Sequence, residues 1–150
     1  MRDADSRLNL RDVSAIEDWV KSDKNFHIVR EHPEGHCMEM CGGMWGCKGG
    51  SVPDMPQLVQ EYLNGTDPNA LGIDQFFLRD IIYPRYAQHS SCVHDQWTPY
   101  REEHATIIRR DLALDGFSFI GEAIDENDVD RWTDHPGEQK DGIKRYYYAK

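Results

Sequence analysis

The chain has 150 residues, 39% of them hydrophobic and 29% charged, so it is long and apolar enough to fold as one domain with a core. Its formal net charge of -10 disfavours nucleic acid and anionic membranes as partners, because phosphate contacts need Lys and Arg. The sequence has no apolar run of membrane-span length and no secretory signal at its charged N-terminus, so we expect its four cysteines to be free thiols in a reducing, cytoplasmic compartment.

Residues 1–7 carry two aspartates, Asp3 and Asp5, between the arginines Arg2 and Arg7. On an extended segment, residues two positions apart point the same way, so both carboxylates can converge on one hard cation. Carboxylate oxygens suit Mg²⁺ or Mn²⁺, and a guanidinium group suits phosphate because it donates two hydrogen bonds at once. The stretch therefore indicates a metal–diphosphate site, and the competing interpretation is a solvated polar terminus.

The first two regular elements are clear from their residue patterns. Asn9 is a good N-cap for a helix over 8–21. The segment 26–30 alternates as a strand should, with Phe26, Ile28 and Arg30 on one side. The apolar face expected for the helix consists of Val13, Ile16, Trp19 and Val20.

Residues 37–50 hold five glycines around Trp45. Such a density costs backbone entropy, so a structural reason is expected. Either a ligand approaches the backbone closely, or the segment is a bulged strand with tight turns.

The rest of the chain alternates helices and strands. Pro56 suits the first turn of a helix over 56–63, and a helix over 74–83 should stop at Pro84. We expect strands over 90–94, 117–121 and 143–148, an ambiguous stretch over 100–114 and a polar loop over 125–142. This alternation favours an α/β fold, with a mixed sheet flanked by helices.

Several cysteines and histidines raise the possibility of a zinc site. The donors are Cys37, Cys41, Cys47 and Cys92 with His32 and His36. They include no Cys-x-x-Cys pair, and buried reduced cysteines are the alternative.

Five stretches of the sequence resemble one family when they are taken together in chain order. They are Arg2-Asp3-Ala4-Asp5-Ser6-Arg7-Leu8, Phe26-His27-Ile28 with His32-Pro33, Gly42-Gly43-Met44-Trp45-Gly46, Asp74-Gln75-Phe76-Phe77-Leu78 and Val93-His94-Asp95. The set resembles glycosyltransferases of the GT-A fold, and most closely the small glycosyltransferase-like proteins of bacteria and large DNA viruses. The likeness covers about residues 1–125 of a single domain over 1–150, with 125–150 as a peripheral tail.

The resemblance implies a metal-dependent donor site. Asp3 and Asp5 match the Asp-x-Asp motif that holds Mn²⁺ or Mg²⁺ against the diphosphate of a nucleotide sugar. His94 matches a late histidine that completes the metal shell in several such families, although it can equally be a hydrogen-bonded histidine at a strand end. Arg2 or Arg7 would add positive charge beside the leaving diphosphate.

The resemblance also implies a sugar and acceptor site. Asp74 would be the catalytic carboxylate facing the acceptor, or simply a helix N-cap. Gly42, Gly43 and Gln75 would line the sugar and acceptor pocket, and Trp45 would stack on a sugar ring or belong to the core. The expected function is transfer of a sugar from a nucleotide-sugar donor to a hydroxyl of a carbohydrate or another acceptor.

The sequence departs from the family at its start. In GT-A enzymes the Asp-x-Asp motif follows a nucleotide-binding half, whereas here it opens the chain. We therefore expect the C-terminal part of such a domain, with an exposed sheet edge that favours self-association or a partner supplying the other half. The alternative to an enzyme is a non-catalytic remnant, or an interaction module that a partner completes or that binds zinc.

Overall fold

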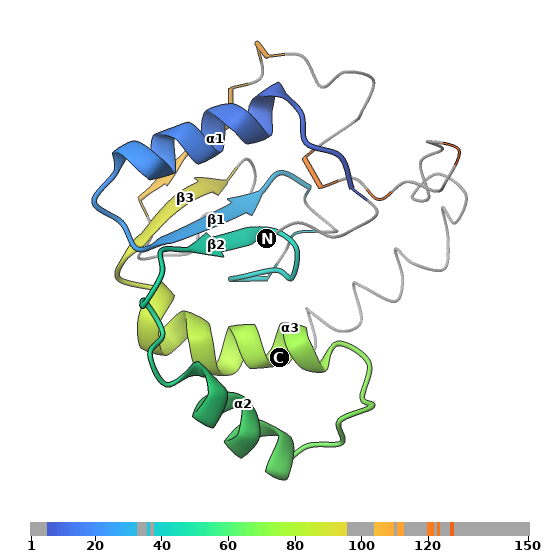
Figure 1. Ribbon diagram of the computed structural model, residues 1–150. Coiled ribbons are helices and arrows are strands. Elements are labelled where there is room, and N and C mark those ends of the chain that lie inside the picture. The colour runs from blue at the N-terminus through green and yellow to red at the C-terminus, as the bar shows by residue number, and fades with distance from the viewer. Residues whose placement is uncertain are drawn as a thin grey trace.

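The computed structural model describes residues 6–32, 36, 38–95, 104–109, 111–112, 120–121, 123 and 127. These residues form an α/β fold in which one helix covers one face of a sheet and further helices cover the other face (Figure 1). The elements are α1 Leu10–Lys21, β1 Phe26–Arg30, β2 Trp45–Cys47, α2 Met55–Asn64, α3 Ile73–Phe77, the π-helix η1 Leu78–Ala87, β3 Ser91–Asp95 and β4 Ala105–Thr106. The mixed α/β class expected from the sequence is confirmed.

The sheet has four strands in the order β2-β1-β3-β4. β1 runs parallel to β3, and β3 runs parallel to β4, whereas β2 is antiparallel to β1. The register pairs Val29 with His94 and Arg30 with Asp95, so β1 and β3 end together at one edge. All five residues of β1 are buried, because helices cover both faces of the sheet.

Two apolar clusters hold the layers together. The first lies where the sheet meets α2, α3 and η1, and it contains Phe26, Ile28, Met40, Trp45, Leu58, Leu78, Ile82, Tyr83, Ala87 and Val93. The second gathers around Val29 near the carboxyl end of β1, and it contains Val29, Met38, Cys41, Met44, Ile108 and Ile120, with Phe76 packed against it.

The start of α1 is confirmed as predicted, with Asn9 as its N-cap. The side chain of Asn9 accepts hydrogen bonds from the backbone N–H groups of Arg11 (3.0 Å) and Asp12 (3.1 Å). The carboxylate of Asp12 in turn accepts from the backbone N–H of Asn9 at 3.3 Å. This reciprocal pair is a capping box, and it explains why the carboxylate of Asp12 is completely buried.

The inward face of α1 differs from the expected one. Val13 and Val20 are 46% and 65% exposed, whereas Ala15 is buried. Trp19 lies against the sheet, and its ring stacks on His27 of β1 with centroids 5.3 Å apart. The predicted face is therefore confirmed for Trp19 and wrong for Val13 and Val20.

Pro84 does not stop the third helix as predicted, because η1 continues α3 through it. Proline lacks an N–H, and in an α-helix its ring clashes with the carbonyl four residues earlier. In η1 the bonds span five residues instead, as the 2.9 Å bond from Gln88 N to Tyr83 O shows. The wider turn gives the proline ring room.

Three other expected elements are confirmed, whereas the two described residues of the strand expected over 117–121, Ile120 and Gly121, lie in a turn. The predicted strands over 26–30 and 90–94 and the helix over 56–63 match β1, β3 and α2 within one residue. The ambiguous stretch over 100–114 contains the short strand β4. The loop over 125–142 and the strand over 143–148 lie outside the described residues apart from Asn127, and the strand over 117–121 lies outside them apart from its last two residues. None of the helices in the described ranges is long and apolar enough to cross a membrane.

A buried ion pair fastens the carboxyl ends of β1 and β3. The Arg30 Nε and Asp95 Oδ2 atoms are 2.9 Å apart, and the two side chains are 1% and 0% exposed. Arg30 also donates from Nη1 to the carbonyl of Glu39 at 3.1 Å, so it ties the glycine-rich segment to the same edge.

Asp95→Ala should lower the free energy of unfolding by about 3–5 kcal/mol, because it leaves a guanidinium group buried without its carboxylate. Urea denaturation followed by tryptophan fluorescence measures this loss. Asp80→Ala is the matched control, since Asp80 pairs with Arg79 at the surface and should contribute less than about 1 kcal/mol. Equal losses in the two variants would show that the pair at the strand ends does not fasten the sheet.

Candidate functional site

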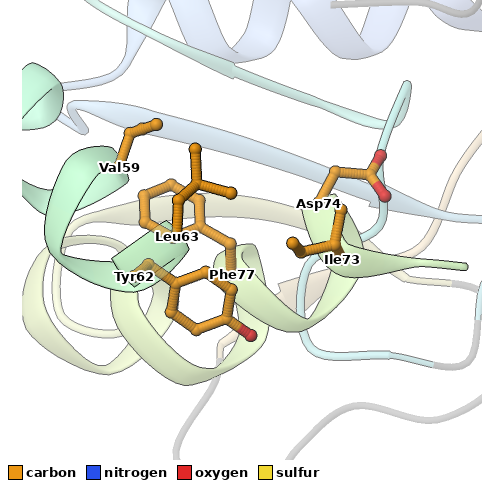
Figure 2. Close-up of a pocket in the computed structure, with 6 residues that line it drawn as sticks. All are labelled: Val59, Tyr62, Leu63, Ile73, Asp74 and Phe77. Carbon is orange, nitrogen blue, oxygen red and sulfur yellow. The ribbon is translucent and has the colours of Figure 1, made fainter. Parts of the chain in front are cut away.

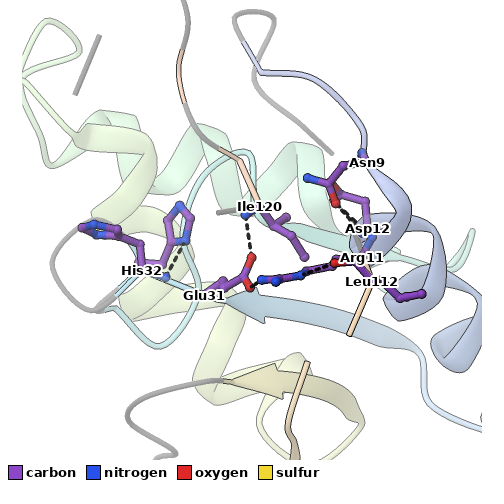
Figure 3. Close-up of polar contacts among 8 residues, drawn as sticks. Asn9, Arg11, Asp12, Glu31, His32, Leu112 and Ile120 are labelled. Atoms are coloured by element: carbon purple, nitrogen blue, oxygen red, sulfur yellow. Dashed lines mark hydrogen bonds and ion pairs between the residues drawn. The ribbon is translucent and has the colours of Figure 1, made fainter. Parts of the chain in front are cut away.

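The carboxyl end of β1 meets the N-terminal end of α1 through a network of polar contacts (Figure 3). Arg11 forms an ion pair with Glu31 and donates from Nε to the carbonyl of Leu112 at 3.1 Å. The other carboxylate oxygen of Glu31 accepts from the backbone N–H of Ile120 at 2.6 Å. The buried carboxylate of Glu31 therefore holds both α1, through Arg11, and the later part of the chain, through Ile120, at this edge of the sheet.

Ser6, which directly follows the Asp-x-Asp motif, lies beside a later part of the chain, near Ile120 in the sequence. Ser6 forms an antiparallel bridge with Ala123. Arg7 comes next and is exposed, as is Leu8, whereas the following residue, the N-cap Asn9 of α1, is buried. Arg2, Asp3 and Asp5 lie outside the described residues, so their roles in binding metal and diphosphate stay predictions.

The structure brings together three of the residues predicted for the acceptor site. A Cβ atom placed on Gly42 would lie 2.4 Å from Nε2 of Gln75 and 3.4 Å from Oδ2 of Asp74. The glycine-rich segment therefore touches the start of α3, and only a glycine leaves room for the Gln75 amide in this position. Oε1 of Gln75 is buried and has no hydrogen-bond partner within the part of the chain that the structure describes.

Helix capping does not account for Asp74. The N-cap of α3 is Gly72, with a left-handed φ of 74°, and no side chain caps this helix. Asp74 lies inside the first turn, where the helix dipole favours a carboxylate. It is exposed, and no hydrogen bond or ion pair of its side chain occurs among the described residues. The carboxylate is thus available to a ligand.

The other residues of the glycine-rich segment have structural roles. Trp45 is 8% exposed and belongs to the first apolar cluster, so its ring faces the core and not an open sugar site. Gly43 is buried with a φ of 69°, which a glycine adopts without strain in a turn. A Cβ on Gly46 would lie 3.1 Å from the ring of Trp19, so this glycine admits the indole of α1.

His94 has protein partners at both ring nitrogens. Its Nδ1 lies 3.1 Å from Nε2 of His27, and its Nε2 lies 3.5 Å from a carboxylate oxygen of Asp18. A carboxylate only accepts, so Nε2 of neutral His94 carries the hydrogen and Nδ1 accepts from His27. The ring is 2% exposed, which matches the hydrogen-bonded alternative for this residue. A cation at His94 would have to displace one of these partners.

Sequence reasoning missed the partners of His94. His27 and His94 lie on one face of the sheet because the parallel register pairs His94 with Val29, two residues beyond His27. Asp18 reaches the pair from α1. The alternation within a strand indicates which face of the sheet each histidine lies on. The pairing of two strands more than sixty residues apart is not a local signal, so the contact between the histidines could not be predicted.

The described residues contain no group of three or more His, Cys, Asp or Glu side chains arranged to hold a metal ion. Cys41 is buried, Cys92 is half-buried and Cys47 is exposed, and all three are free thiols. Cys41 thus matches the alternative of a buried reduced cysteine, whereas Cys47 and Cys92 are reduced but not buried, and Cys37 lies outside the described residues.

Comparison with known proteins adds no relative. No family model, no curated protein and no solved structure matches the chain. The assignment of a function therefore depends on the geometry above and on the resemblance of the motifs.

The free energy of unfolding should fall as the pH drops through the range of a free histidine, about 6.5, towards 5. Burial lowers the pKa of His94, and the neighbouring Asp18 only partly offsets this. The unfolded chain then binds more protons than the folded one below that pH, so acid costs stability, by up to about 1.4 kcal/mol per pH unit for each proton. Above about pH 6.5 His94 is neutral in both the folded and the unfolded chain, so this loss of stability is absent.

Urea midpoints measured from pH 5 to pH 8 test this expectation. His94→Asn should flatten the profile between pH 5 and pH 7, whatever its effect on absolute stability. His89→Asn, at an exposed histidine, is the control. A profile that is as steep in His94→Asn as in the unchanged chain would assign the acid sensitivity to other groups.

Proposed function

We propose that this chain is the catalytic region of a metal-dependent glycosyltransferase, which moves a sugar from a nucleotide-sugar donor to an acceptor hydroxyl. The observation that carries the proposal is the contact of Gly42 with Asp74 and Gln75. These residues come from two separate stretches of the GT-A-like pattern, and all three were expected on the acceptor side. This contact places the available carboxylate of Asp74 beside the backbone of the glycine-rich segment.

The position of this contact in the fold supports the proposal. In open α/β sheets, ligands bind outside the carboxyl ends of the parallel strands. Phe76, next to Gln75, packs against the second apolar cluster, which also contains Val29 near the end of β1 and Ile120. Phe76 at the start of α3 and Ile120 therefore pack in the same apolar cluster at this edge of the sheet.

On the donor side, the proposal assigns Asp3 and Asp5 to a divalent cation, Mn²⁺ or Mg²⁺, and Arg2 and Arg7 to the diphosphate. A bound cation would supply charge neutralisation at the leaving diphosphate. The arginines would add to this through bidentate hydrogen bonds to phosphate oxygens. His94 is left out of this set because His27 and Asp18 already engage its ring.

On the acceptor side, Asp74 acts as the general base. In an inverting transfer the acceptor oxygen bonds to the anomeric carbon while the bond to the diphosphate breaks, and a carboxylate takes the hydroxyl proton. Gln75 would orient the acceptor by a hydrogen bond to a second hydroxyl once its side chain turns toward the site, because its Oε1 atom is buried and lacks a partner among the described residues. Gly42 leaves the space that the Gln75 amide occupies beside Asp74.

Asp5→Ala should abolish Mn²⁺-dependent binding of nucleotide sugars while the fold survives. Thermal-shift titration with a panel of nucleotide sugars, with and without Mn²⁺, measures this binding. Asp67→Ala is the control, because Asp67 is an exposed carboxylate in the loop before α3. Nucleotide-sugar binding that is the same in Asp5→Ala and in the unchanged chain would remove the metal site from the proposal.

Asp74→Asn should lower the rate of sugar transfer by about 10²–10⁴-fold, because a general base contributes an acceleration of that size. Donor binding should persist, since the amide keeps the shape of the side chain. Release of nucleoside diphosphate in the presence of candidate acceptors measures the rate, with Asp67→Asn as the matched control. A variant with full transfer rate would refute the role of Asp74 as base.

A further inference from the structure

A pocket of about 230 Å³ opens between α2 and α3, next to the acceptor residues (Figure 2). Apart from one carboxylate and one phenol, its walls are hydrocarbon. The lining residues are Val59, Tyr62 and Leu63 of α2 and Ile73, Asp74 and Phe77 of α3.

The walls of this pocket offer apolar surface to a ligand. Val59 and Leu63 are each 37% exposed, although both face the pocket. The rings of Tyr62 and Phe77 pack edge to face, with centroids 5.3 Å apart, so they form an ordered aromatic wall. An engineered apolar cavity of about 150 Å³ holds benzene in another protein, so a phenyl ring or a short alkyl chain fits the volume here.

The rim of the pocket carries the two acceptor oxygens of one carboxylate, that of Asp74. The Asp74 carboxylate points away from the apolar side chains in Figure 2, and Gly42 lies beside it. This carboxylate has no hydrogen-bond or ion-pair partner among the described residues. A complementary ligand therefore brings a hydroxyl or ammonium group to the rim and an apolar group to the pocket.

We propose that the pocket between α2 and α3 binds the apolar part of an acceptor alcohol, an aryl or alkyl group, whose hydroxyl reaches Asp74. The acceptor role of the hydroxyl rests on the proposed function. The binding itself uses only the hydrocarbon wall and the acceptor-rich rim, so it requires neither metal nor nucleotide sugar. The concave shape and small volume fit one such group better than the broad face of a second copy.

Titration of the full chain with phenylbutanol, followed by ligand-observed NMR, tests the pocket. The unchanged chain should bind this alcohol, and Val59→Glu should weaken binding by about tenfold or more, because it places a charge in the apolar wall. Val20→Glu is the matched control on α1, across the sheet, and should bind as the unchanged chain does.

A second comparison tests the rim. Phenylbutanoate has the same carbon skeleton but ends in a carboxylate, so Asp74 should repel it, and it should bind about tenfold more weakly than the alcohol. Asp74→Asn should remove most of this difference. Equal affinities of the unchanged chain for the two ligands would overturn the proposal.

The remaining outcomes separate this inference from the proposed function. Alcohol binding that depends on Val59, in a chain without any sugar transfer, supports the pocket while the transferase function fails. Sugar transfer to polar acceptors without alcohol binding overturns the pocket while the function stands. If sedimentation shows that Val59→Glu separates a dimer and no alcohol binds, the groove is an interface between copies and the inference is overturned.

Discussion

The parallel pairing of β1 with β3 is the constraint on which the rest of the described structure depends. It joins strands that are far apart in the sequence, and the intervening chain supplies β2, α2, α3 and η1. Both strands are covered on their two faces, and the pair Arg30–Asp95 fastens their carboxyl ends. Without this pairing, His94 would not reach His27, and the glycine-rich segment would lose its tie to the edge.

The chemistry of the site follows from what this edge leaves unsatisfied. Most of the polar groups nearby are engaged, as Glu31 is by Arg11 and Ile120. Among the described residues, the Asp74 carboxylate is exposed and without a partner, and it lies beside Gly42 and adjoins an apolar pocket. A carboxylate beside hydrocarbon is complementary to a ligand with a hydroxyl on an apolar body, so the proposed transfer and the proposed acceptor preference depend on the same residue.

Local patterns in the sequence predicted the elements that depend on local physics. β1, β3, α2 and the N-cap Asn9 were placed within one residue, because alternation, proline position and capping are short-range signals. The predicted inward face of α1 was right for Trp19, which packs on His27, and wrong for Val13 and Val20, which are exposed. The grouping of Gly42, Asp74 and Gln75 came from the resemblance of motifs, since no local pattern brings these stretches together.

The path of η1 through Pro84 has a consequence for the length of this part of the chain. Leu78 and Ala87 are both buried, nine positions apart. At 3.6 residues per turn, nine positions would put them on opposite sides of a helix, whereas the wider winding makes this distance about two full turns. The stretch between α3 and β3 therefore contains about two residues more than two turns of an ordinary α-helix, about one for each turn. An alignment or redesign that removes them would rotate the buried residues of η1 away from the sheet.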